Sequence, residues 1–330
     1  MTEVFSGIHW IKLPMSPDNT NRDNINIYLI RGKDGYLMVD SGWNTDISFS
    51  IVHNYLVKNN LNFGDISQIV VTHSHPDHYG MAGRIKQLSG ATLAMHHLED
   101  KVIEPRYVHQ ESLLQETGRM LEDNGLPYEE MKMLRDASVE MTPFVIPAHP
   151  DFTLHDGDTV STGEFTFRAV WTPGHSAGHV CLYEPNKKIL LSGDHILPRI
   201  TPNISVHPQS IENPLGRYIE SLKEIRKLDI ELTLPGHDAP FDDPTQRIDD
   251  IVEHHIQRNL DILVALQQET KNTYQIAREL IWGTRSRYTD LPEFHKRMAV
   301  FETLAHIEMM TTEGNLDILP GKGVKYYRQR

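Results

Sequence analysis

Cysteine is nearly absent from this sequence: its 330 residues include one, Cys181. A single thiol cannot form an intramolecular disulfide, and it excludes a structural zinc site built from several thiolates. Cys181 lies in the apolar segment 180–183, where we expect it to act as a small buried hydrophobic residue. A chain without disulfides is typical of a reducing compartment, so we expect a cytoplasmic protein.

Long apolar runs and an excess of positive charge are also lacking. No stretch approaches the roughly 18 consecutive apolar residues of a membrane-spanning helix, and residues 1–7 have neither the basic nor the apolar part of an export signal. The 45 acidic residues outnumber the 32 basic ones and give a net charge of −13. Such acidity disfavours general binding to nucleic acid or to an anionic membrane surface, so we expect neither as a partner.

Histidine, in contrast, is abundant, with 19 residues. The densest group follows the apolar segment 66–71 and comprises His73, His75, Asp77 and His78. The segment has the pattern of a strand. Because side chains alternate along a strand, His73 and His75 can point the same way, with the other two on the turn beyond. This density of ligand-type side chains predicts a metal site.

Three later apolar segments end in a similar turn. Segments 165–170, 188–191 and 231–234 are followed by His175, Asp194 and His237 respectively. Ligands at the ends of separate strands can meet at one edge of a sheet. The predicted set is therefore His73, His75, Asp77, His78, His175, Asp194 and His237. Imidazoles and carboxylates suit zinc, manganese or iron, and two metal ions are the natural count for so many ligands.

Strand and helix patterns alternate in the first part of the chain, beginning with strands at 4–13 and 25–30. This alternation predicts a layered α/β fold with sheet inside and helices outside. Residues 98–142 are helical in composition, and we interpret them as a helical insertion that serves either as a lid over the substrate or as a packing or dimer surface. We predict a catalytic domain over 1–243 and a mainly helical, winged-helix-like C-terminal module over 244–330.

The pattern His-x-His-x-Asp-His, followed by Gly-His, Gly-Asp and Gly-His at strand ends, resembles the metallo-β-lactamase superfamily over residues 1–243. The resemblance implies a four-layer αβ/βα sandwich with the site along one edge of two facing sheets. It implies that one metal is held by His73, His75 and His175, and a second by Asp77, His78 and His237, with Asp194 bridging both. Asp40 matches an aspartate that orients the ligands.

The same resemblance implies the chemistry. A hydroxide held between two divalent ions, zinc first with iron or manganese as alternatives, would be the nucleophile. The resemblance implies that Asp77 and Asp194 are the catalytic carboxylates. Asp77 could hold the proton of the hydroxide. The true lactamases have cysteine or serine at the position of Asp194, which argues against antibiotic hydrolysis. Quorum-quenching lactonases have a tyrosine where this chain has Leu197.

We therefore predict a dinuclear metal hydrolase that acts on a small ester, lactone or thioester. Arg199, which follows Asp194, is a candidate for binding an anionic group of the substrate. Tyr107 and His109 flank the insertion and could face the substrate. One alternative is a metal-dependent (ribo)nuclease, because residues 271–330 carry ten basic and seven acidic residues. Another is a sulfur oxygenase with a single iron. The helical additions also offer surfaces for a homodimer.

Overall fold

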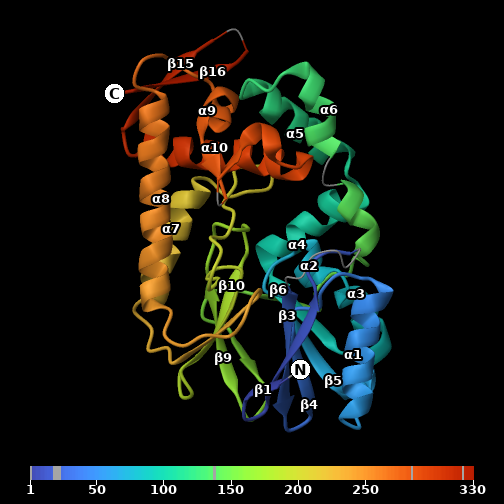
Figure 1. Ribbon diagram of the computed structural model, residues 1–330. Coiled ribbons are helices and arrows are strands. Elements are labelled where there is room, and N and C mark those ends of the chain that lie inside the picture. Colours follow the sequence, from blue (N-terminus) through green and yellow to red (C-terminus); the bar gives the residue numbers. More distant parts are fainter. Residues whose placement is uncertain (1, 18–23, 137–138, 284, 322) are drawn as a thin grey trace.

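The computed structural model describes residues 2–17, 24–136, 139–283, 285–321 and 323–330. Two β-sheets pack face to face, and helices cover the outer face of each (Figure 1). The predicted four-layer α/β sandwich is therefore confirmed. Residues 137 and 138 of the predicted insertion lie outside the described residues.

The first sheet has seven strands in sequence order. They are β1 (Thr2–Phe5), β2 (Ile8–Pro14), β3 (Asn24–Gly32), β4 (Gly35–Val39), β5 (Ile66–Val70), β6 (Thr92–His96) and β7 (Phe152–Leu154). Strands β1 to β4 form an antiparallel meander, and β4 to β7 run parallel. The single strand predicted over 4–13 is wrong, because the chain turns at Gly7, whose φ of 87° suits glycine, and splits the segment into β1 and β2.

The second sheet has the order β12-β11-β10-β9-β8. Its strands are β8 (Thr159–Ser161), β9 (Thr166–Trp171), β10 (Val180–Glu184), β11 (Ile189–Gly193) and β12 (Leu232–Pro235). Apolar residues of both sheets, including Val39, Val70, Phe167 and Leu191, form the buried layer between them. Cys181 on β10 is buried, in agreement with its prediction as a small hydrophobic residue.

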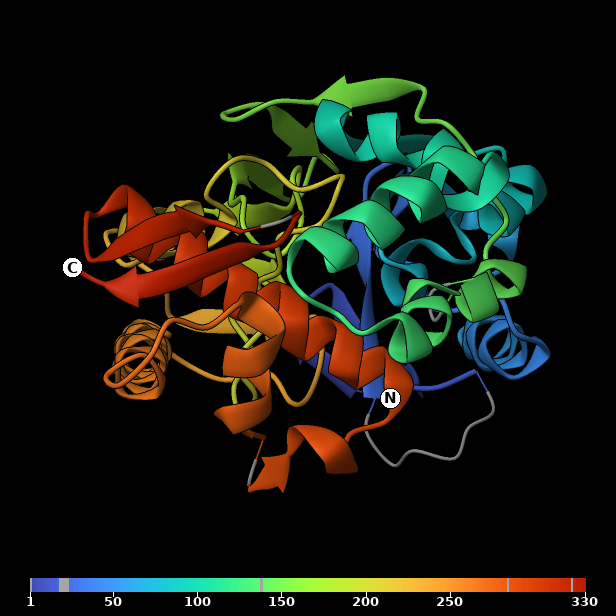
Figure 2. The same cartoon turned by 90° about the horizontal axis from the view of Figure 1, so that it is seen from above.

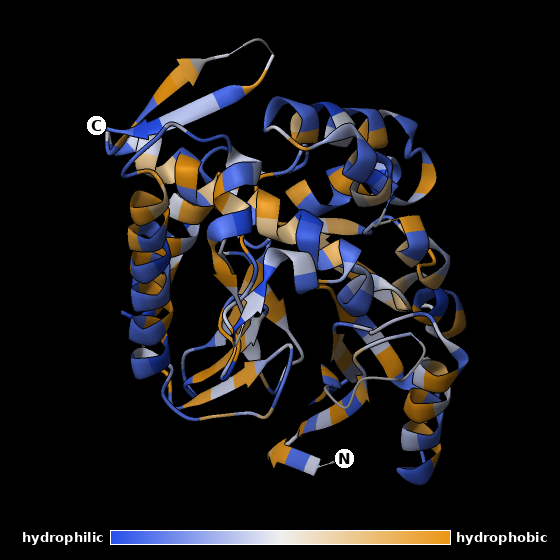
Figure 3. Ribbon diagram, turned by 45° about the horizontal axis from the view of Figure 1, so that its top comes forward, coloured by the Kyte–Doolittle hydropathy of each residue, from blue (hydrophilic) through white to orange (hydrophobic). Residues whose placement is uncertain are grey.

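Helices complete the outer layers. The first sheet is covered by α1 (Asp46–Lys58), α3 (Ala82–Ser89) and α4 (His97–Ile103), and the second by α7 (Pro214–Ile225) and α8 (Thr245–Ala265). These flanking helices carry both apolar and polar residues (Figure 3). Helix α7 was not predicted, although it begins with Pro214 after Asn213, whose side chain accepts a hydrogen bond from the Gly216 N–H. In the part of the chain that is described, no helix is long and apolar enough to cross a membrane.

A further helical layer lies over one end of the two sheets (Figures 1 and 2). It contains α5 (Glu111–Asp123), α6 (Tyr128–Asp136), α9 (Thr273–Glu279), α10 (Glu293–Thr312) and the hairpin of β15 (Leu316–Pro320) and β16 (Lys325–Gln329). Leu121 and Leu126 of the insertion share one hydrophobic cluster with Tyr274 and Val300 of the C-terminal region. The two segments predicted as separate additions therefore pack together, and the domain boundaries stay a prediction.

The remaining elements are short. They are α2 (Pro76–Tyr79), η1 (Phe63–Asp65), the π-helical turn η2 (Glu104–Val108), η3 (Val139–Phe144), β13 (Ile281–Trp282), β14 (Ser286–Arg287) and η4 (Tyr288–Asp290). Of these, α2 carries Asp77 and His78, and Tyr107 of η2 donates a hydrogen bond to the Ser74 carbonyl.

Two buried histidines join α8 to α10. His255 Nδ1 lies 3.2 Å from His306 Nε2, and His306 Nδ1 donates to Asn259 Oδ1 at 2.6 Å. Burial, aided by His254 and Arg258, lowers the pKa of His255 to about 3. Burial and His255 hold the pKa of His306 well below its usual value. Both rings are therefore neutral in the folded protein near neutral pH.

We expect this pair to make the protein less stable in acid. A histidine in the unfolded chain has a pKa of about 6.5. Below that pH the unfolded protein binds protons at these two histidines, and the folded protein does not. Each histidine then removes up to about 1.4 kcal/mol of unfolding free energy per pH unit as the pH falls. Urea unfolding at pH 7.5 and 5.5 should show a smaller loss in His255→Gln than in the native protein. His53→Gln, at an exposed position of α1, is the control, and an unchanged loss in His255→Gln would contradict this account.

Candidate metal centre

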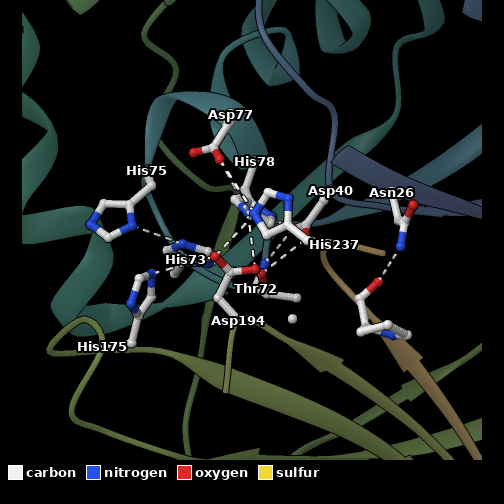
Figure 4. Close-up of polar contacts among 12 residues, drawn as sticks. Asn26, Asp40, Thr72, His73, His75, Asp77, His78, His175, Asp194 and His237 are labelled. Carbon is white, nitrogen blue, oxygen red and sulfur yellow. Dashed lines mark hydrogen bonds and ion pairs between the residues drawn. The ribbon is translucent and has the colours of Figure 1, made fainter. Parts of the chain in front are cut away.

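The ends of four strands bring the predicted ligands together (Figure 4). His73 and His75 follow β5, and Asp77 and His78 lie in the short helix α2. The other three ligands follow β9, β11 and β12: His175, Asp194 and His237. All seven side chains converge in Figure 4. The structure therefore brings together every residue of the predicted set.

The ligand atoms fall into three groups, in each of which they lie within 4.8 Å of one another: His73, His75 and His175; Asp77, His78 and His237; and His73, His78 and Asp194. The first two groups share no residue. Asp194 lies between them, because its Oδ2 is 3.6 Å from His175 Nε2 and 3.2 Å from His237 Nε2, while its Oδ1 is 3.3 Å from His78 Nε2. The geometry is that of two adjoining ligand sets with one carboxylate between them.

Two of these ligand atoms have no hydrogen-bond partner among the described residues. His175 Nε2 and Asp194 Oδ1 are buried and form no hydrogen bond within the described residues. The Nε2 atoms of His78 and His237 face each other at 3.3 Å. Buried polar atoms left unpaired are costly, and nitrogen and oxygen lone pairs that converge are the donor set of a divalent transition metal ion. The residues present therefore fit a metal ion.

Hydrogen bonds on the far side of each ring fix its orientation. His175 Nδ1 donates to the Asn203 carbonyl at 2.9 Å, and His237 Nδ1 donates to the Asn24 carbonyl at 3.1 Å. Since Nδ1 is the donor in each ring, Nε2 keeps its lone pair and points into the site.

Asp40, directly after β4, orients side chains of the turn that carries His73 to His78, the histidine turn. Its Oδ2 accepts from His78 Nδ1 at 2.8 Å and from Thr72 Oγ1 at 2.9 Å, and its Oδ1 accepts from the Thr72 N–H at 2.7 Å. Thr72 Oγ1 in turn lies 3.1 Å from His73 Nδ1. One buried carboxylate thus orients His78 directly and His73 through a threonine.

The electrostatics favour a bound cation. Burial and neighbouring imidazoles hold the pKa of both His73 and His75 well below the usual value, so both rings are neutral. For His78, burial alone would lower the pKa, but Asp194, Asp77 and Asp40 outweigh it and raise the pKa well above the usual value. Carboxylates that draw protons onto a histidine would equally attract a metal ion in the place of those protons.

Comparison with known proteins identifies the family. The sequence profile of the Metallo-beta-lactamase superfamily matches residues 20–237, which is more than half of the chain. The chain belongs to the metallo-beta-lactamase superfamily. The resemblance to this superfamily that the histidine motif indicated is thereby confirmed.

Two relatives match most of the chain, and a third matches part of it. A metallo-beta-lactamase family protein of Thermus thermophilus has 26% identity and a TM-score of 0.83, over 99% of this chain and 100% of that one. The probable metallo-hydrolase YqjP of Bacillus subtilis is 23% identical over 89% of this chain and 86% of its own length. An atrochrysone carboxyl ACP thioesterase of Aspergillus fumigatus is 31% identical over 38% of this chain and 39% of its own length. The protein is therefore an enzyme, a hydrolase of the metallo-beta-lactamase superfamily.

One buried carboxylate beside the candidate metal centre could not be predicted from the sequence. Glu99 of α4 accepts from the Ser74 N–H at 2.8 Å, from Ser74 Oγ at 2.5 Å and from the Gly178 N–H at 2.7 Å. It thereby ties the histidine turn to the loop that carries His175. A glutamate in the first turn of a helix commonly interacts with the helix dipole. Nothing in the sequence around Glu99 indicates that its side chain is buried.

The three residues predicted to meet the substrate have other contacts in the structure. The phenol of Tyr107 is buried and donates to the Ser74 carbonyl. The side chain of His109 is 81% exposed and lies 3.7 Å from the Glu104 carboxylate. Arg199 is 71% exposed and forms an ion pair with Asp238, which is the surface role that an arginine at a loop often has. Their part in substrate binding stays a prediction.

Proposed function

We propose that this protein is a dinuclear metal hydrolase that acts on a small acyl ester or thioester. The observation that carries the proposal is the position of Asp194, whose carboxylate lies between the His73, His75 and His175 group and the Asp77, His78 and His237 group. A carboxylate has two oxygens and can serve two metal ions at once. With a single metal ion, one of the two groups would have no role.

In this proposal the chain's own residues hold and orient the reacting groups. Divalent ions bound there would lower the pKa of a water molecule and polarise the scissile carbonyl. Asp77 Oδ2, 3.5 Å from His237 Nε2 and 3.7 Å from His78 Nε2, is placed to accept a proton at the same site. Asp40, Asn203 and Asn24 keep the imidazole lone pairs directed inward.

Four features favour a thioester or ester over other substrates. A thioesterase is among the relatives. The aspartate at 194 stands where the lactamases of the family have cysteine or serine, and Leu197 stands where its lactonases have tyrosine. The net charge of −13 opposes the electrostatic attraction that binding of nucleic acid requires.

An activity screen tests the proposal. The purified protein, loaded in turn with zinc, manganese and iron, is offered acyl thioesters, acyl esters, lactones, phosphodiesters and RNA. We expect hydrolysis of a thioester or ester that a chelator abolishes and added metal restores. RNA cleavage without ester hydrolysis would support the nuclease instead, and oxygen uptake by the iron-loaded protein would support the sulfur oxygenase.

Replacing Asp40 should weaken metal binding without removing a ligand. Asp40→Asn keeps the shape of the side chain, but it replaces the charge that holds His78 and Thr72 with a neutral amide. Loss of such an outer contact typically reduces metal affinity or activity about 10- to 100-fold. Competition with a chromogenic chelator measures the affinity. Asp46→Asn, at a fully exposed side chain on α1, is the matched control, and equal affinity in both variants would contradict the assigned role.

A further inference from the structure

The loop after β11 provides a backbone atom to the metal centre. The Asn203 carbonyl accepts from His175 Nδ1 at 2.9 Å, while His175 Nε2 is buried and has no hydrogen-bond partner within the described residues. Residues 194–213, which include Asn203, form neither a helix nor a strand. The loop therefore has no hydrogen-bonded ladder of its own to fix this carbonyl, and its position depends on what the loop packs against.

Helices of the C-terminal region hold the loop in place. Arg247 of α8 donates to the Leu197 carbonyl at 2.7 Å and to the Ile200 carbonyl at 2.8 Å. Further along the loop, the Val206 N–H donates to the Phe301 carbonyl of α10 at 3.1 Å. The segment that orients a metal ligand is thus supported by α8 and α10, which lie outside the predicted catalytic domain.

Glu302 of α10 contacts Asn203 itself. Asn203 Nδ2 donates to Glu302 Oε2 at 2.7 Å, and Asn203 Oδ1 accepts from Ser205 Oγ. The side chain of Glu302 is only 14% exposed, and its Oε1 lies 4.0 Å from Arg258 Nε. Water cannot readily replace a hydrogen bond in so buried a place, so the bond holds the Asn203 amide in one position.

We propose that Glu302 is a positioning residue for the metal ligand His175 and acts through Asn203. Glu302 holds the amide side chain, and the amide holds the backbone of the loop at Asn203. The Asn203 carbonyl then keeps the proton of His175 on Nδ1, so that Nε2 retains its lone pair for the metal ion. Helix α10 is thereby part of the metal centre. The inference rests on the proposed function only in taking His175 to be a metal ligand.

Zinc affinity tests this role. The protein is titrated with zinc in competition with a chromogenic chelator. Glu302→Ala removes the acceptor of the hydrogen bond, and Asn203→Ala removes its donor but keeps the backbone carbonyl. In both variants we expect the ion whose affinity falls in His175→Ala to bind about 10- to 100-fold more weakly than in the native protein. Glu302→Gln keeps an acceptor oxygen and should bind zinc within about twofold of the native affinity.

A double variant shows whether the effect passes through His175. In His175→Ala the Asn203 carbonyl has no imidazole to orient. Adding Glu302→Ala to His175→Ala should therefore change the remaining zinc affinity by no more than about twofold. An equal loss with and without the imidazole would show that Glu302 acts on another part of the centre, and would overturn the proposal.

Glu308→Ala is the matched control for folding. Glu308 also lies on α10, and its carboxylate accepts from the Asn213 N–H of the same loop at 2.7 Å. Glu308→Ala should lower the stability in urea, as Glu302→Ala does, but keep the native zinc affinity. Equal losses of zinc affinity in these two variants would overturn the proposal, as would native affinity in Asn203→Ala, which also decides the case if Glu302→Ala does not fold.

The ring of His175 can be observed directly. In protein labelled with ¹⁵N-histidine, two-bond ¹H–¹⁵N spectra without metal show which ring nitrogen carries the proton. We expect the Nδ1–H form in the native protein and in Glu302→Gln, and a mixture of both forms in Glu302→Ala and Asn203→Ala. An unchanged Nδ1–H form in both alanine variants would contradict the proposal. None of these measurements needs a substrate, so they support the role of Glu302 even if the protein hydrolyses no ester or thioester, in which case the proposed function alone fails.

Discussion

Asp194→Ala is expected to lose turnover and metal together. Its carboxylate lies within 3.6 Å of His175, His78 and His237, so its removal takes a ligand atom from both halves of the centre. Metal ions contribute several kcal/mol of transition-state stabilisation, and we therefore expect at least about a 1,000-fold fall in kcat/KM. Metal content by mass spectrometry and hydrolysis of the preferred thioester measure the two losses on one preparation.

The matched control is Asp250→Ala, an exposed aspartate on α8, which should keep both metal and activity. Circular dichroism checks that each variant is folded. If Asp194→Ala keeps its metal and at least a tenth of the native activity, Asp194 is not the bridging ligand that the proposal requires.

Glu99→Ala is expected to have the largest effect on stability. The substitution leaves the Ser74 N–H, Ser74 Oγ and the Gly178 N–H without their acceptor in a buried place. Hydrogen bonds to a charged group contribute about 1.5–3 kcal/mol each, so we expect the free energy of unfolding to fall by at least about 3 kcal/mol. Urea unfolding measures the change, and metal affinity should fall with it because the histidine turn loses its anchor.

Glu116→Ala, at an exposed position of α5, serves as the control and should change stability by less than about 0.5 kcal/mol. Glu99→Gln retains one acceptor oxygen and should lie between the native protein and Glu99→Ala. A Glu99→Ala protein as stable as the control would show that this carboxylate does not tie the two loops together.

The ligand set could be predicted from the sequence because its signals are local. An apolar strand that ends in histidine or aspartate leaves a short-range pattern, and four such ends imply one sheet edge. The role of Asp40 was predicted from the family resemblance, which matches it to an aspartate that orients the ligands. The orienting carbonyls of Asn203 and Asn24 could not be predicted, because backbone atoms carry no residue-type signal.

The surroundings of the centre depend on contacts between distant segments. Glu99 has the pattern of an ordinary helix charge, and its position becomes clear only when β6 and α4 are placed beside the histidine turn. Likewise the shared core of Leu121 and Val300 joins parts of the chain that composition alone separates. Arg199 was favoured because it follows Asp194 in sequence, yet its ion pair with Asp238 depends on a loop from another strand.

The number of metal ions per chain tests the central claim most directly. Metal-free protein is titrated with zinc while thioester hydrolysis and bound metal are followed together. The account predicts that binding saturates at two ions per chain and that full activity requires the second. Full activity at one ion, or with the metal removed, would contradict it.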